Sequence, residues 1–69
     1  MAISAKRVQY LWQEDSDNLA KSFTRILKDF GYTLTAEWVK EQITKAQSGE
    51  KLVGGPGMFI ERWLKEGID

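Results

Sequence analysis

Apolar residues between Asn18 and Gly31 recur at steps of three and four, and this is the clearest hydrophobic pattern in the chain. At about 100° per residue, these positions form one helical stripe about 120° wide, and a stripe of this kind faces a core. Gly31 follows at once, and glycine readily adopts the left-handed conformation in which many helices end. We therefore predict a core-facing helix near residues 17–30, with Tyr32 folding back onto Leu27. The stripe comprises Leu19, Ala20, Phe23, Ile26, Leu27 and Phe30.

Two further helices are predicted because a serine or a threonine precedes apolar residues that recur at helical spacing. Ser4 starts a helix near residues 4–13 and Thr35 starts one near residues 35–48, because a hydroxyl in this position accepts a hydrogen bond from a free backbone amide. Each start is flanked by an apolar pair with the spacing of a hydrophobic staple. These pairs are Ile3 with Val8 and Leu34 with Val39.

Residues 54–57 read Gly-Gly-Pro-Gly and interrupt the helical spacing. We predict a loop there, followed by a last helix near residues 58–66 that ends before Gly67, with Ile68 folding back onto Trp63. The alternative is a short hairpin across the glycines, because the residues on either side of them are apolar enough to form strands. Its two arms would be residues 51–53 and 58–60.

Taken together, these patterns predict an all-α fold, a small bundle of four short helices with a glycine loop before the last one. The chain has 69 residues, and chains of this size bury only about 60% of their unfolded surface. That is enough for one core and not for two. We therefore treat residues 1–69 as a single small domain of modest stability.

Two short stretches resemble ligand-binding motifs but lack their essential residues. The acidic run at residues 14–18 has no glycine and glutamate at the positions that an EF-hand loop requires, so we expect Asp15, Ser16 or Asp17 to cap the helix near residues 17–30. The glycines at 54–57 are followed by methionine, whereas a phosphate-binding loop has lysine there. Neither stretch predicts a ligand.

The chain contains no cysteine and no histidine. It therefore has no thiolate to act as nucleophile or zinc ligand, and it lacks the usual general base near neutral pH. Only carboxylates, hydroxyls and lysines remain for chemistry. We expect no enzymatic activity, no catalytic residues, no cofactor and no metal.

An excess of aromatic side chains supports the leading functional hypothesis. Three Trp, three Phe and two Tyr are many for this length, and some lie beside the predicted core stripes. Exposed aromatic and methionine side chains with a charged rim are typical of protein contacts. We predict a module that binds another protein or a second copy of itself, unless an irregular core buries these side chains. Its predicted contact residues are Trp38, Met58 and Phe59, with Lys51 and Arg62 as the polar rim.

A second hypothesis is DNA binding, although ten Lys and Arg balance ten Asp and Glu overall. The helices near residues 17–30 and 35–48 are spaced like a helix-turn-helix, in which the second helix enters the major groove. Mixed charges on that second helix count against this interpretation, because acids repel phosphate. The cations that would contact nucleic acid are Lys6, Arg7, Lys21, Arg25 and Lys28.

The location of the protein is predicted from its apolar runs. None approaches the length of about 20 residues that spans a bilayer, and residues 1–9 lack the apolar stretch of a secretion signal. We expect a cytoplasmic protein that makes no contact with membranes.

Overall fold

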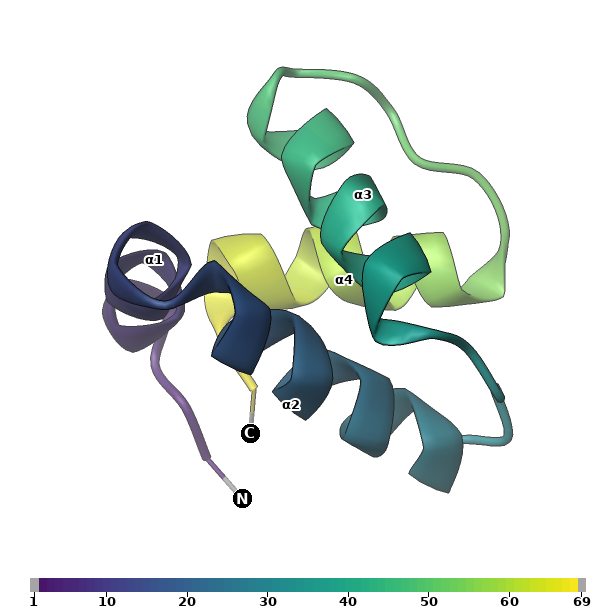
Figure 1. The fold of residues 1–69 in the computed structure, drawn as a ribbon. Helices are drawn as coiled ribbons and strands as arrows, with labels where there is room; N and C mark the ends of the chain where they lie inside the picture. The colour runs from purple at the N-terminus through teal and green to yellow at the C-terminus, as the bar shows by residue number, and fades with distance from the viewer. Residues whose placement is uncertain (1, 69) are drawn as a thin grey trace.

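The computed structural model describes residues 2–68, which form an all-α bundle of four helices (Figure 1). The helices are α1 (Ala5–Glu14), α2 (Ser16–Asp29), α3 (Ala36–Gln47) and α4 (Gly55–Glu66). Helix α2 packs against α1 and α3, and α4 packs against the same two helices. The predicted fold class is therefore confirmed.

The predicted start signals lie where the first three helices begin. The Ser4 hydroxyl accepts a hydrogen bond from the Arg7 amide at 3.2 Å, and the Thr35 hydroxyl accepts one from Trp38 at 3.1 Å. Among the three candidate caps of α2, Asp15 has this role. Its backbone N–H also donates to the Leu11 carbonyl, which closes the end of α1. One residue therefore joins the two helices, and the polar connection is shorter than predicted.

Helix α4 begins three residues earlier than the sequence indicated. It starts at Gly55, so that Pro56 and Gly57 lie in its first turn and not in a loop. Proline suits a first turn because the N–H that it lacks has no helical partner there. Gly57 is buried, and a Cβ on it would lie 3.0 Å from the Leu52 side chain. The hairpin alternative is wrong, because residues 58–60 are helical.

The core is entirely apolar among the described residues, with no buried polar or charged side chain. Phe23 at its centre packs edge-to-face on Trp63, with ring centroids 5.2 Å apart. Most of the predicted α2 stripe is buried, but Phe30 is 57% exposed. It is the C-cap of α2, at the end of the stripe, and its ring lies on α4 instead of entering the core. The buried side chains are Val8, Leu19, Ala20, Phe23, Leu27, Val39, Ile43, Leu52, Ile60, Trp63, Leu64 and Ile68.

The predicted stop at Gly31 is also present. Gly31 has a φ of +94°, and the Tyr32 amide donates to the Leu27 carbonyl at 3.0 Å, as in a Schellman motif. At the end of α4, Gly67 has a φ of +81°, and its amide donates to the Trp63 carbonyl at 2.8 Å. Both glycines therefore end their helices with a positive φ, and the ψ of −171° at Gly67 places it in an extended region that only glycine adopts readily.

The two ends of the described chain are joined by a backbone pair that the sequence did not predict. Ile3 and Ile68 exchange two hydrogen bonds, each 2.6 Å long, in an isolated antiparallel bridge. We call this pair the terminal bridge. Ile68 is buried as well, so this bridge also closes the core at the ends of α1 and α4.

Candidate functional site

A cluster of aromatic rings extends from the core to the surface between α2 and α4. Phe30 and Phe59 stack with ring centroids 4.9 Å apart and planes inclined by 28°. Trp63 lies 5.5 Å from Phe59 and also contacts the buried Phe23. Tyr32 also packs edge-on against Phe59, with ring centroids 6.1 Å apart. Phe59 is thus held in place by three neighbouring rings, although it is only partly buried.

Exposed apolar side chains gather around this cluster. In residues 2–68, four large hydrophobic side chains are more than half exposed, and three of them lie here: Phe30 at 57%, Met58 at 70% and Val53 at 84%. Single exposed apolar residues are ordinary, but a contiguous group commonly marks a contact site. We call this group, with the two rings beside it, the α4 surface. It comprises Phe30, Tyr32, Val53, Met58 and Phe59.

Two open grooves run on either side of Phe59. The larger one has a volume of about 930 Å³ and lies between α4 and the segment 51–54, with Tyr32, Val53 and Met58 in its walls. The smaller one, of about 560 Å³, lies between α4 and the end of α2. Arg62 and Glu66 of α4 line both grooves. The α4 surface therefore has apolar walls and a rim of both charge signs.

The side chain of Glu61 holds the larger groove in shape. Its carboxylate accepts a hydrogen bond from the Leu52 amide at 2.5 Å, and the Leu52 side chain is buried under Gly57. Val53 directly follows this fixed residue. The exposed wall of the groove is thus attached to the core by one buried side chain and one charged hydrogen bond.

Four of the five predicted contact residues line the larger groove together. These are Lys51, Met58, Phe59 and Arg62. Trp38 lies elsewhere: it is a partly buried residue of α3 that packs against the core and lines neither groove. Phe30, which the helical stripe assigned to the core, belongs to the surface instead. Its position directly before the stop at Gly31 was the available signal of this exposure, since no further helical turn follows it to cover its side chain.

The five cations of the DNA-binding hypothesis are all exposed but do not line one groove. Lys6 lines a shallow groove with Tyr10 and the end of α4, and the Arg7 guanidinium lies 5.2 Å from the Tyr10 ring centre. Arg25 lines the smaller groove beside Phe30. Lys21 and Lys28 lie on the outer face of α2, opposite its buried stripe. Arg25 therefore lies beside the aromatic cluster, whereas Lys6 lies on another face of the protein.

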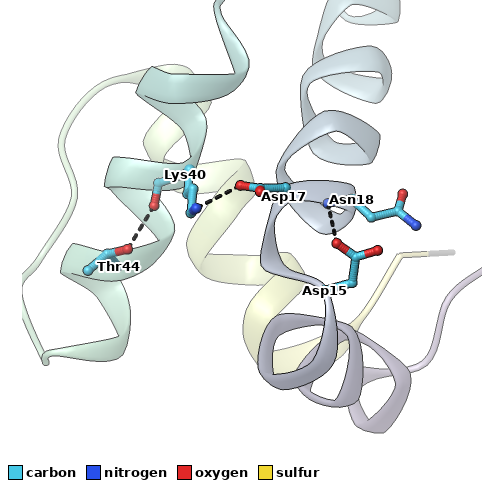
Figure 2. Close-up of polar contacts among 5 residues, drawn as sticks. All are labelled: Asp15, Asp17, Asn18, Lys40 and Thr44. Atoms are coloured by element: carbon cyan, nitrogen blue, oxygen red, sulfur yellow. Dashed lines mark hydrogen bonds and ion pairs between the residues drawn. The ribbon is translucent and has the colours of Figure 1, made fainter.

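Both lysines of α3 are paired with carboxylates, as Figure 2 shows for the first of them. Lys40 Nζ lies 2.6 Å from an Asp17 oxygen of α2, and Lys45 Nζ lies 3.7 Å from Glu41. Phosphate contacts by either lysine would compete with these pairs. Helix α3 is the helix that would enter the major groove in the DNA-binding hypothesis. It therefore offers little unpaired positive charge to phosphate.

The Lys40 pair gives one prediction about pH. The hydrogen bond and charge of Lys40, with a smaller effect of Lys21, hold the pKa of Asp17 below its ordinary value. A carboxyl whose pKa is lowered by folding stabilises the protein above its unfolded pKa, and this contribution is lost as the pH falls through the folded pKa. The free energy of unfolding of Asp17→Asn should therefore approach that of the wild type in acid.

Urea melts at several pH values would measure this difference. We expect it to be small even at neutral pH, because the pair is exposed to solvent. Glu37→Gln is the control, since Glu37 is also an acid in the first turn of a helix and has no side-chain partner in the described chain. A difference for Asp17→Asn that stays constant down to low pH would show that Lys40 does not stabilise the folded carboxylate.

Known proteins do not assign a role to this arrangement: no family model, no curated protein and no solved structure matches the chain. No helix within residues 2–68 combines the length and the apolar composition that crossing a membrane requires. In the same part of the chain, no three carboxylates lie together in a group suited to a metal ion. The α4 surface is therefore interpreted from its own geometry.

Proposed function

We propose that the protein is a non-enzymatic interaction module that binds another protein chain through the α4 surface. One observation carries this proposal: Phe30 at the C-cap of α2 and Phe59 of α4 stack on each other at the surface beside the exposed Met58. Aromatic and methionine side chains are enriched in protein interfaces, and buried aromatic anchors commonly contribute about 2 kcal/mol or more. The mixed charges of the rim suit the polar edge of such a contact.

The rigidity of this surface supports the same proposal. Phe59 is held by three rings, and the Leu52 amide is bound by Glu61, so this ring and the backbone next to Val53 are positioned before any partner arrives. Each side chain that binding must immobilise costs about 0.5–1.5 kcal/mol. A surface that is ordered in advance avoids part of that cost.

Site-specific photo-crosslinking tests the proposal. A benzophenone amino acid replaces Met58 on the α4 surface or Glu37 on the outer face of α3, and the protein is irradiated in its native cells. We expect adducts from position 58 and few from position 37. Phe30→Ser in the first protein should reduce the adducts several-fold, while circular dichroism shows the helices retained.

Equal labelling from both positions would contradict the proposal. So would retention on mixed-sequence DNA at low salt that weakens in Lys21→Ala, with the slope of log affinity against log salt falling by about 1 for that lost contact. That result would favour the alternative hypothesis, in which the exposed cations of α2 contact phosphate.

A further inference from the structure

The partner that best fits the α4 surface is a second copy of this chain. We propose that two copies pack α4 against α4 about a twofold axis near Phe59, so that each covers the other's aromatic stack. This inference rests on the proposed function, and it adds the identity of the partner. It is carried by the charges of the rim, by the layout of the grooves and by the net charge of the chain.

The rim is self-complementary in charge. Arg62 and Glu66 line both grooves, and within the described chain neither has an ion-pair partner. Next to them, Lys65 borders the larger groove, while Arg25 and Asp29 border the smaller one. A twofold contact places the same patch on both sides, so a patch that carries charges is self-complementary only when it holds both signs. An acidic or a basic partner would instead favour a rim of one sign.

A contact centred on Phe59 would cover both grooves, and this extent suits the area that a stable twofold interface needs. A stable interface buries about 800 Å² per chain, which is about a sixth of the 4677 Å² that this chain exposes. One groove alone supplies only part of that area. Helix α4 has 12 residues and is about 18 Å long, so a second α4 lying across Phe59 reaches both grooves at once.

The net charge of the chain and its size favour the same partner. Ten cations balance ten anions, so two copies approach each other without overall repulsion. A domain of this size also has a small core, and domains of this kind commonly gain stability by associating. Covering Met58 and Phe30 would add apolar burial that the single chain lacks.

Sedimentation equilibrium with charge-reversed variants tests the inference. The acidic-rim variant carries Arg62→Glu and Lys65→Glu, and the basic-rim variant carries Asp29→Lys and Glu66→Lys. We expect the wild type to sediment as two chains and each variant alone as one, because its rim then repels its own copy. An equimolar mixture of the two variants should regain the mass of two chains.

Two results would overturn the inference. One is a wild type that stays a single chain at concentrations up to about 1 mM, the weak end of measurable affinity. The other is a dimer that persists in both variants and in Met58→Lys, since it would then form through another face. In either case the crosslinks from position 58 distinguish failure of the dimer from failure of the proposed function. Adducts with a different protein would contradict the dimer but support the proposed function. The absence of adducts would contradict both.

Discussion

Replacing Phe23 by alanine is expected to cost about 3–5 kcal/mol of unfolding free energy, the usual range for a fully buried phenylalanine. Phe23 is 0% exposed, lies at the centre of α2 and packs edge-to-face on Trp63 of α4. Its loss would leave a cavity between the two helices. A domain of 69 residues is expected at the low end of the usual total stability of about 5–15 kcal/mol, so the variant should lose most of its margin. Urea melts followed by circular dichroism measure the change.

Phe30→Ala is the matched control, because the same substitution is made at the C-cap of the same helix, where the ring is exposed. Phe30 stacks on Phe59, and an aromatic pair contributes about 0.5–1.5 kcal/mol beyond its buried area. We therefore expect a distinctly smaller loss than for Phe23→Ala. Equal losses, or a loss below about 1 kcal/mol for Phe23→Ala, would contradict the placement of α2 in the core.

Replacing Gly67 by alanine should be the most damaging glycine substitution in the chain. Gly67 has a φ of +81°, and a Cβ there would collide with the Ile3 carbonyl oxygen and lie 2.7 Å from the Ala5 amide nitrogen. The new atom would therefore separate Ile3 from Ile68 and break the terminal bridge. This backbone conformation alone, with a ψ of −171°, costs alanine about 1–3 kcal/mol, and each lost hydrogen bond adds about 0.5–1.5 kcal/mol. We expect a total loss above about 2 kcal/mol, to be measured by urea melts.

Gly49→Ala separates these two effects. Gly49 has a φ of +91°, but a Cβ there would meet nothing within 4 Å. This control should show only the conformational cost of about 1–2 kcal/mol. Hydrogen exchange of the Ile3 and Ile68 amides should speed up in Gly67→Ala alone. Identical stability losses and exchange rates in the two variants would mean that the terminal bridge contributes nothing to the fold.

Local signals in the sequence were enough to predict the helices, because each depends on neighbouring residues. The hydroxyls of Ser4 and Thr35 cap helices as predicted, and Gly31 ends α2 in the left-handed conformation. The start of α4 was misjudged because Gly-Gly-Pro-Gly has the composition of a turn. Pro56 in fact fits the first helical turn, where a missing N–H has no cost.

Features that depend on distant segments were beyond the sequence pattern. The terminal bridge joins Ile3 to Ile68 across nearly the whole chain, and no periodicity encodes such a pair. Trp38 was grouped with Lys51, Met58, Phe59 and Arg62, but only these last four share a groove, because they belong to one helix and the segment before it, whereas Trp38 belongs to α3. The exposure of Phe30 depends on how α2 meets α4. The helical stripe predicts only that the residue faces that side, and its position directly before Gly31 was the one local signal of its exposure.

Hydroxyl-radical footprinting tests most directly whether the α4 surface is a contact site. Met58, 70% exposed, and Phe30 should be oxidised readily in dilute purified protein. In native cells both should be protected, while Tyr10 of α1, 52% exposed, is oxidised equally under the two conditions. Equal oxidation of Met58 in cells and in dilute solution would contradict the account, and protection of Tyr10 alone would place the contact on the face that carries Lys6 and Arg7.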